Sequence, residues 1–191
     1  MKPMKSYPQP GVNASSLPRK RIAAPQVGLC ETIYDVYWEG PFTWKGKAMH
    51  FKPHHVLYAI YGVHHLYGPN ALLYLGKTDC SVKNRCSIHE EWVADEYDTV
   101  TIRVASVGPF QGWATWDPKK NPSPAPDRKI VEGVESLLLY AFQPTYNGKD
   151  KQRLRDEAKG MRIFNTGRVG RFLPELSYLY FSGDSKITKR P

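Results

Sequence analysis

The sequence predicts an α+β domain, and three patterns carry that prediction. Residues 56–62 and 71–77 are short apolar and aromatic runs joined by Gly-Pro turn chemistry, which is typical of a β-hairpin. Residues 99–105 alternate between apolar and polar side chains, as a half-buried strand does. A long helix follows, because apolar residues recur at helical spacing between Asp127, a favourable N-cap, and Pro144.

Weaker patterns predict the remaining elements. Residues 32–38 are β-branched and aromatic and predict a strand, followed by a turn at 39–41 and a return over 42–51. Ser81 is a good N-cap for a loosely amphipathic helix that reaches about Ala94. The expected elements also include a short helix over 151–160 and a closing strand over 177–181.

Composition bounds the class of protein. The chain has 191 residues, and its 27 Lys and Arg against 18 acids give a net charge of +9. Such a surplus favours a polyanionic partner, although a merely soluble basic protein is the alternative. The longest apolar run, residues 137–142, is too short to span a bilayer, and we expect no membrane contact. The N-terminus lacks the apolar stretch of a secretory signal, and three cysteines without a Cys-x-x-Cys pair favour reduced thiols in the cytoplasm.

Several residues in these elements could carry chemistry. Arg85 and His89 are four residues apart, so one helix would present both on one face. Glu135 lies in the middle of the long helix, either on its surface or as an inward ligand, with Glu132 as a competitor. Taken alone, each of these residues is ordinary, as are tyrosines in strands and a lysine at a strand end.

The order of these residues resembles the GIY-YIG nuclease superfamily. The matching motifs, in chain order, are Val56-Leu57-Tyr58, Tyr74-Leu75-Gly76 with Lys77-Thr78, Arg85-x-x-x-His89, Glu135-Ser136-Leu137-Leu138, and Pro144-Thr145-Tyr146-Asn147. The spacing to Asn147 selects Glu135 over Glu132. The chain departs from the family pattern at Val56, where the first motif usually has glycine, and its loop between the tyrosines is longer than in minimal members.

The resemblance implies a fold and a division of the chain. The family fold is a small three-stranded antiparallel β-sheet flanked by helices. On that basis residues 54–148 form the nuclease core, 29–53 an N-terminal β addition, and 149–191 a basic C-terminal extension that packs on the core. Residues 1–28 are basic and rich in proline, and we expect a flexible arm there.

The resemblance also implies metal-dependent hydrolysis of nucleic-acid phosphodiesters. Glu135 would hold one Mg²⁺, or Mn²⁺ in its place, because hard cations prefer carboxylate and water oxygens. Arg85 would bind a non-bridging phosphate oxygen. Tyr58 is the general base that the resemblance suggests, helped by His89 or Lys77, but His89 has the better ordinary pKa and the choice stays open. Tyr74 would orient water or phosphate, and Asn147 would bridge by hydrogen bonds.

Basic and aromatic additions predict the substrate. The candidates for nucleic-acid binding are Trp113, Trp116, Lys119, Lys120, Arg168 and Arg171, with Arg19, Lys20 and Arg21 in the arm. A hydrophobic lid is the alternative for the tryptophans, and a solvated tail for the arm. Double-stranded DNA cleaved by a restriction-type enzyme is the leading interpretation. A palindromic site would need two active sites and hence a homodimer.

Three alternatives stay open. The protein could cleave single-stranded or branched DNA, or it could be a nucleic-acid-binding module that keeps the fold without catalysis. A third interpretation makes a structural metal site from the paired histidines. These are His50, His54, His55, His64 and His65. Adjacent strand residues point to opposite faces, so at most one histidine of each pair could converge on an ion.

Overall fold

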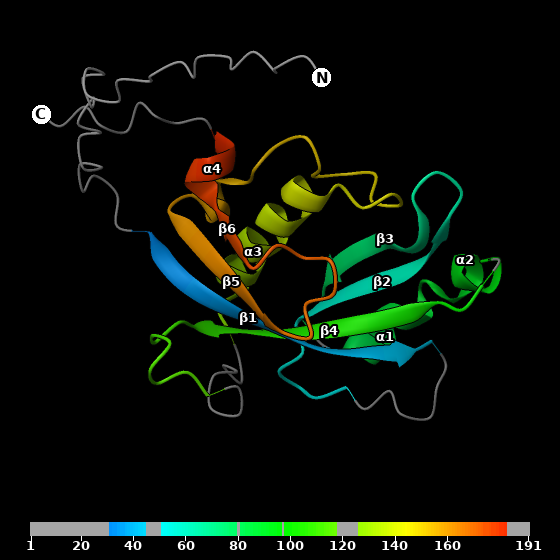
Figure 1. Ribbon diagram of the computed structural model, residues 1–191, viewed down its shortest axis with the longest axis horizontal. Helices are drawn as coiled ribbons and strands as arrows, with labels where there is room; N and C mark the ends of the chain where they lie inside the picture. Colours follow the sequence, from blue (N-terminus) through cyan, green and yellow to red (C-terminus); the bar gives the residue numbers. More distant parts are fainter. Residues whose placement is uncertain (1–30, 45–50, 80, 97, 118–125, 183–191) are drawn as a thin grey trace, which may run out of the picture.

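The computed structural model describes residues 31–44, 51–79, 81–96, 98–117 and 126–182 (Figure 1). The strands are β1 (Thr32–Thr43), β2 (Leu57–His64), β3 (Gly68–Lys77), β4 (Thr101–Pro109), β5 (Met161–Gly167) and β6 (Glu175–Ser177). The helices are α1 (Val82–Ser87), α2 (Glu90–Ala94), α3 (Arg128–Phe142) and α4 (Tyr178–Ser182), with a 3₁₀ turn at Asp156–Ala158.

The strands form one curled, mixed sheet in the order β3-β2-β4-β1-β5-β6 (Figure 1). Strands β1 and β5 pair in parallel, and the other neighbours are antiparallel. The α+β class and the expected hairpin are confirmed. The expected three-stranded sheet is wrong, because β3, β2 and β4 are continued by three further strands in the same hydrogen-bonded sheet.

Helices cover the two faces of the sheet unequally. Helix α3 packs on one face, where Val134, Leu137 and Leu138 join a core that extends from β2 to β5. Helices α1 and α2 cover the other face only at the β2–β4 half, where Val82 and Cys86 pack in a smaller core. Strand β3 is therefore an edge strand with a helix on each side, and this arrangement positions the site described below.

Three local expectations near the N-terminal half are corrected. Strand β1 does not turn at residues 39–41 but continues through a bulge between Glu39 and Phe42. Gly40 permits this, since its φ is +115° and a Cβ there would lie 2.9 Å from the Ile102 carbonyl oxygen. The expected return ends at Thr43 as part of the same strand, and residues 45–50 lie outside the described residues. The single helix over 81–94 is divided into α1 and α2 by a turn at residues 88–89.

The C-terminal section also differs from expectation. Strand β5 was not predicted, yet it pairs with β1 along seven residues from Thr32 to Trp38. The helix expected over 151–160 is only the short 3₁₀ turn. The closing strand expected over 177–181 is instead helix α4, because the Ser177 hydroxyl accepts a hydrogen bond from the Leu179 amide and starts a helical turn.

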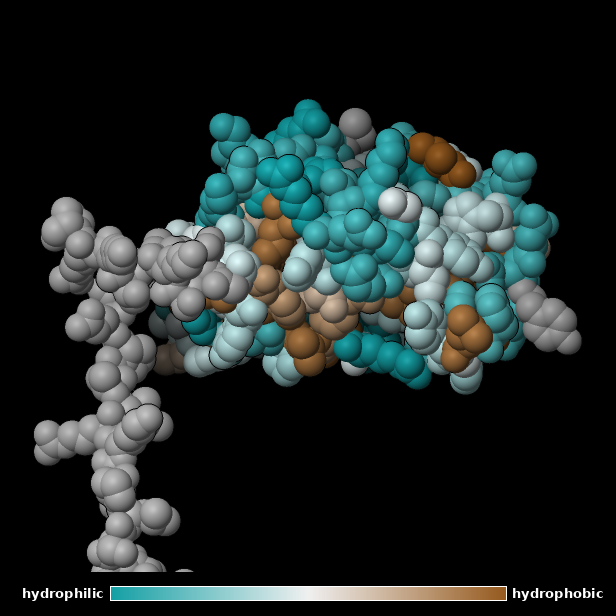
Figure 2. All heavy atoms as spheres, turned by 90° about the horizontal axis from the view of Figure 1, so that it is seen from above, coloured by the Kyte–Doolittle hydropathy of each residue, from teal (hydrophilic) through white to brown (hydrophobic). Residues whose placement is uncertain are grey.

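The surface is predominantly polar on the side shown in Figure 2, where hydrophobic residues appear in small, separate groups. None of the helices in the described ranges is long and apolar enough to cross a bilayer.

Candidate active site at the β3 edge

The two motif tyrosines lie side by side on adjacent strands. Tyr58 on β2 and Tyr74 on β3 have ring centroids 5.9 Å apart and nearly parallel planes. Tyr58 is fully buried, whereas Tyr74 is partly exposed and lines a cavity. Burial raises the pKa of Tyr58 above its ordinary value, as does the neighbouring phenol of Tyr74. Tyr58 is therefore the inner tyrosine of the pair, and Tyr74 is the outer one, which faces the cavity.

Gly76 provides the space that this pair needs. It is the register partner of Tyr58 across the β2–β3 ladder. A Cβ at Gly76 would lie 2.7 Å from the Tyr58 hydroxyl oxygen and 2.8 Å from Cε1 of Tyr74. The glycine of the second motif is therefore explained by close approach of two rings and not by an unusual φ.

His89 lies behind the tyrosines, at the junction of α1 and α2. Its Nε2 atom is 2.9 Å from the Tyr58 hydroxyl oxygen, and its ring centroid is 4.4 Å from that of Tyr74. Burial and, next, the charge of Arg85 lower the pKa of His89, which favours the neutral ring. Because the expected helix is broken here, His89 points into the core while Arg85 points into the cavity.

The cavity has a volume of about 600 Å³ and is open to solvent on the β3 edge. Its walls come from three elements: β3 contributes Tyr74 and Lys77, α1 contributes Arg85, and α3 contributes Glu135. Five motif residues thus meet at one location, four on the cavity wall and Tyr58 directly behind Tyr74.

Glu135 is the buried carboxylate of the cavity. Glu135 is only 9% exposed, and its carboxylate forms no ion pair with any described residue. Burial raises its pKa to about 7, while the charges of Lys77 and Arg155 and a backbone hydrogen bond from Lys77 act in the opposite direction. A carboxylate oxygen that is buried, faces a solvent-filled cavity and lacks an ion-pair partner is a suitable ligand for a hard cation.

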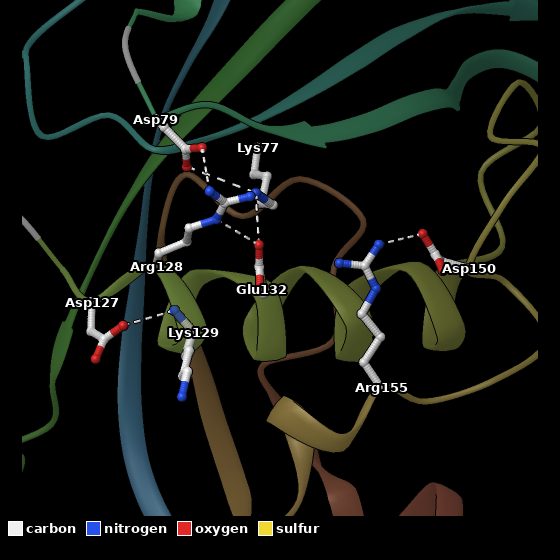
Figure 3. Close-up of polar contacts among 8 residues, drawn as sticks. All are labelled: Lys77, Asp79, Asp127, Arg128, Lys129, Glu132, Asp150 and Arg155. Atoms are coloured by element: carbon white, nitrogen blue, oxygen red, sulfur yellow. Dashed lines mark hydrogen bonds and ion pairs between the residues drawn. The ribbon is translucent and has the colours of Figure 1, made fainter.

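Glu132, one helical turn earlier, has a different environment. Its carboxylate pairs with Arg128 at 2.9 Å and with Lys77 at 3.3 Å, and Asp79 completes the cluster (Figure 3). The ion pairs occupy Glu132, which agrees with the choice of Glu135 from its spacing to Asn147. Lys77 reaches the cavity from within this cluster.

Two further arginines on the cavity wall were not predicted from the sequence. Arg128 lies seven residues before Glu135, which places both on one helix face, and this spacing was an available signal. Arg155 reaches the cavity from the loop after α3, and Asp150 pairs with its guanidinium at 2.5 Å (Figure 3). Its backbone amide donates to the Ser136 hydroxyl at 2.9 Å, a contact between distant residues that no local pattern predicts.

Asn147 supports the edge strand from outside the cavity. Its side-chain oxygen accepts from the Leu75 amide at 2.9 Å, and its side-chain nitrogen donates to the Leu75 carbonyl at 2.8 Å. The neighbouring amide of Tyr146 donates to the Leu73 carbonyl. Asn147 therefore fixes the backbone between Tyr74 and Gly76, which makes it a positioning residue in this geometry.

The predicted nucleic-acid-binding residues that the structure describes, Trp113, Trp116, Arg168 and Arg171, do not line this cavity. Trp116 donates from Nε1 to buried Asp35 at 3.1 Å, and exposed Trp113 packs edge-on against Phe110 and at a tilt against Phe164. Both tryptophans thus pack at the β1–β5 half of the sheet. Lys119, Lys120, Arg19, Lys20 and Arg21 lie outside the described residues.

Arg168 and Arg171 are exposed on the loop after β5. Arg171 donates to the Pro69 carbonyl at 3.3 Å, which ties this loop to the β2–β3 hairpin. The Arg168 carbonyl accepts from Arg103 at 2.6 Å, which adds a third arginine to this surface. The surface and the cavity are separate sites on the same sheet.

The paired histidines do not converge as one group. His54 and His55 precede β2, and His64 ends it, so the pairs lie at opposite ends of one strand. Glu39, His54 and His55 alone bring ligand atoms together in the described ranges. However, His55 Nδ1 accepts from the Lys52 amide, so its proton lies on Nε2 and points at Glu39, 2.5 Å away. Lys52 also pairs with Glu39, and both contacts fit an ion-paired cluster better than a metal site.

No family model, curated protein or solved structure matches the chain. The case for function therefore depends on the residues of the cavity.

Proposed function

We propose that the protein is a metal-dependent endonuclease of the GIY-YIG type. The observation that carries the proposal is the convergence of Tyr74, Lys77, Arg85 and Glu135 on one cavity, although they come from three elements. A chance match of short motifs would not be expected to bring its residues together. Perturbed titratable groups in a cleft are, in addition, typical of active sites.

The donor set of the cavity fits one Mg²⁺ or Mn²⁺ ion. Glu135 offers a carboxylate oxygen next to a cavity large enough for the water ligands that Mg²⁺ retains. An ion held there supplies charge stabilisation for the crowded phosphate and for the leaving 3′ oxygen.

The cationic side chains of the cavity suit a phosphodiester. Arg85 and Arg155 both reach the cavity, and a guanidinium binds two phosphate oxygens in one plane. Arg85 is exposed and makes no ion pair with a described residue, so it is available to a non-bridging oxygen. Arg155 is already held by Asp150, which fixes its direction for an adjacent phosphate.

Tyr74 is the tyrosine in position to receive a proton from water. Of the two tyrosines and His89, it alone lines the cavity in the described part of the chain. Tyr74 first gives its phenol proton to solvent through the open cavity. As water attacks phosphorus, it gives a proton to the Tyr74 oxygen, and the bond from phosphorus to the 3′ oxygen breaks. The leaving oxygen then takes a proton from solvent. This proposal departs from the roles that the resemblance implies, in which Tyr58 or His89 is the base and Tyr74 orients water or phosphate. The reason is that Tyr58 and His89 are buried behind Tyr74 and do not line the cavity.

Double-stranded DNA is the substrate that the exposed arginines favour. Arg168 and Arg171 carry positive charge on a glycine-flanked loop outside the cavity, where phosphates or guanine edges could bind. Restriction-type cleavage of a palindrome would use a homodimer, one active site for each strand. A structure-selective or single-strand nuclease and an inactive binding module are the competing functions.

The test is a substrate panel. The full-length protein is incubated with duplex, single-stranded and branched DNA and with RNA, with Mg²⁺ or EDTA, and product ends are mapped. The proposal expects Mg²⁺-dependent cleavage, with discrete duplex fragments for a restriction enzyme and products at junctions for a structure-selective one. Binding without cleavage of any substrate would support the inactive module and contradict the proposal.

A further inference from the structure

The hydrogen bonds around His89 define the direction in which protons are donated. The Trp92 indole Nε1 donates to His89 Nδ1 at 3.1 Å. An indole N–H can only donate, so Nδ1 must be the unprotonated nitrogen of the ring. In the neutral ring the proton then lies on Nε2, which is 2.9 Å from the Tyr58 hydroxyl oxygen. His89 therefore donates to Tyr58 and cannot accept its proton there.

The same direction continues toward the cavity. The Tyr58 oxygen accepts from His89, which leaves its own hydroxyl hydrogen for a neighbour. On the cavity side, Tyr58 neighbours Tyr74, whose ring centroid lies 5.9 Å from its own and which lines the cavity. Trp92 thus donates to His89 and His89 to Tyr58, so donors are aligned in the direction of the cavity, an arrangement that stabilises negative charge at its far end.

Trp92 is itself held in place. It lies three residues after His89 on the first turn of α2, so the two side chains share a helix face. The Tyr146 ring packs edge-on against the indole at 5.1 Å, and the Tyr146 hydroxyl donates to Glu96 at 2.7 Å. These contacts fix the indole N–H in the direction of His89.

We propose that Trp92 is a positioning residue that holds His89 in the Nε2–H tautomer, so that His89 serves as a hydrogen-bond donor to Tyr58 and not as the general base. The catalytic consequence rests on the proposed nuclease function, whereas the tautomer does not. The role is indirect, since Trp92 contacts His89 and does not line the cavity in the described part of the chain.

The tautomer is measured directly by NMR. Long-range ¹H–¹⁵N correlation spectra of the uniformly ¹⁵N-labelled protein distinguish Nε2–H from Nδ1–H rings, and H89Q identifies the His89 signal among six histidines. We expect the Nε2–H form in the wild type and a shift toward a tautomer mixture in W92F. W113F is the matched control, because it removes an exposed indole N–H that does not contact His89 and should leave the spectrum of His89 unchanged. An Nδ1–H ring in the wild type would overturn the proposal, even if the protein cleaves nothing.

Activity separates a donor from a base. Glutamine at position 89 can donate from its side-chain nitrogen to Tyr58 but cannot take up a proton, whereas leucine can do neither. We expect H89Q to keep cleavage within about tenfold of the wild type and H89L to reduce it about 100-fold, in the range expected when a buried oxygen loses its hydrogen-bond donor. W92F should lower kcat by roughly tenfold with KM unchanged.

The outcomes distinguish the two proposals. If H89Q is as inactive as H89L while both remain folded by circular dichroism, His89 acts as a base and the inference fails, although the nuclease function stands. If the wild type cleaves no substrate, the nuclease function fails, and the NMR tautomer alone decides the inference. Should W92F fail to fold, the wild-type tautomer and the H89Q and H89L pair still decide it.

Discussion

Two buried carboxylates in this protein have contrasting environments. Asp35, on β1, is fully buried, and its two oxygens accept hydrogen bonds from Thr166 at 2.6 Å and Trp116 at 3.1 Å. Glu135, on α3, is nearly as buried but faces a cavity and has no ion-pair partner among the described residues. The Asp35 carboxylate is satisfied by side-chain donors within the protein. The Glu135 carboxylate has no such side-chain partner in the described part of the chain and is available to a ligand in the cavity.

The contrast extends to the two halves of the sheet. In the β1–β5–β6 half, Glu31 is paired with Arg162 at 2.7 Å and with the Ser177 hydroxyl at 2.6 Å. In the β3 half, Arg85 and Glu135 share a cavity without pairing with each other. Polar groups that are paired within the protein stabilise the fold, and charged groups held apart in a cavity are available to a ligand. This difference is why we place the proposed active site in the β3 half.

The largest expected effect concerns the arginines of the cavity. We expect R85A to lower single-turnover DNA cleavage about 1,000-fold, since in the proposed mechanism the charge that it removes would lie beside the reacting phosphate. R155A should reduce cleavage roughly 10- to 100-fold, because its guanidinium would bind an adjacent phosphate in that mechanism. R153A is the matched control, an exposed arginine two residues from Arg155 that does not line the cavity, and it should retain activity. Equal activity of R85A and R153A would contradict the assignment of the cavity.

A smaller effect is expected at Gly76. We expect G76A to displace the Tyr58 hydroxyl, because the added Cβ would lie 2.7 Å from its oxygen, and to lower cleavage about 100-fold. Overpacking should also reduce the free energy of unfolding by about 1–3 kcal/mol, measured in urea. G148A is the control, since no atom lies within 4 Å of a Cβ there. Unchanged activity in G76A would show that the tyrosine pair is not part of the machinery.

The comparison of carboxylates predicts opposite stability changes. The folded-state pKa of Glu135 is about 7, above the ordinary glutamate value, so stability falls as pH rises from about 4.5 to 7. In EDTA, the free energy of unfolding of E135Q should equal that of the wild type near pH 4. Above pH 7 it should be larger than that of the wild type, by at most about 3 kcal/mol. D35N should be less stable than the wild type by about 1–3 kcal/mol, because it removes a buried acceptor. A stability decrease in E135Q at pH 8 would refute the contrast.

The smallest effect concerns the separate arginine surface. We expect R168A and R171A each to weaken duplex binding modestly and to reduce the slope of log K against log salt concentration by about 0.9 for each phosphate that the variant no longer neutralises. The turnover rate at saturating DNA should stay unchanged, because neither residue lines the cavity. Fluorescence anisotropy over a salt series measures the slope. A slope equal to that of the wild type in the double variant would remove this surface from the DNA interface.

Local patterns in the sequence predicted the elements that form the cavity. The β2–β3 hairpin and helix α3 have strong turn, capping and periodicity signals, and they carry Tyr58, Tyr74 and Glu135. The register that places Gly76 opposite Tyr58 was not predicted, because the β2–β3 ladder shifts between Ile60 and Tyr61 and again between Gly62 and His64. Asp127 caps α3 as expected, and its side chain accepts from the Lys129 amide at 2.8 Å (Figure 3).

Features that depend on distant contacts could not be predicted. Strand β5 forms because β1 offers a parallel partner more than a hundred residues earlier, and its own pattern is mixed. Arg155 enters the cavity only because its loop binds back to Ser136 on α3. Which of Tyr58 and Tyr74 faces the cavity also depends on distant contacts, because Tyr58 is buried in the core to which α1 contributes Val82 and Cys86.

The location of a bound metal ion tests the central claim most directly. Crystals of the protein with a duplex carrying a non-hydrolysable phosphate linkage are grown with Mn²⁺, and anomalous scattering locates the ion. Our account predicts Mn²⁺ at the Glu135 carboxylate, with a phosphate oxygen beside it and Arg85 on the same phosphate. Mn²⁺ bound only at Glu39, His54 and His55, with the Glu135 cavity holding neither ion nor phosphate, would contradict it.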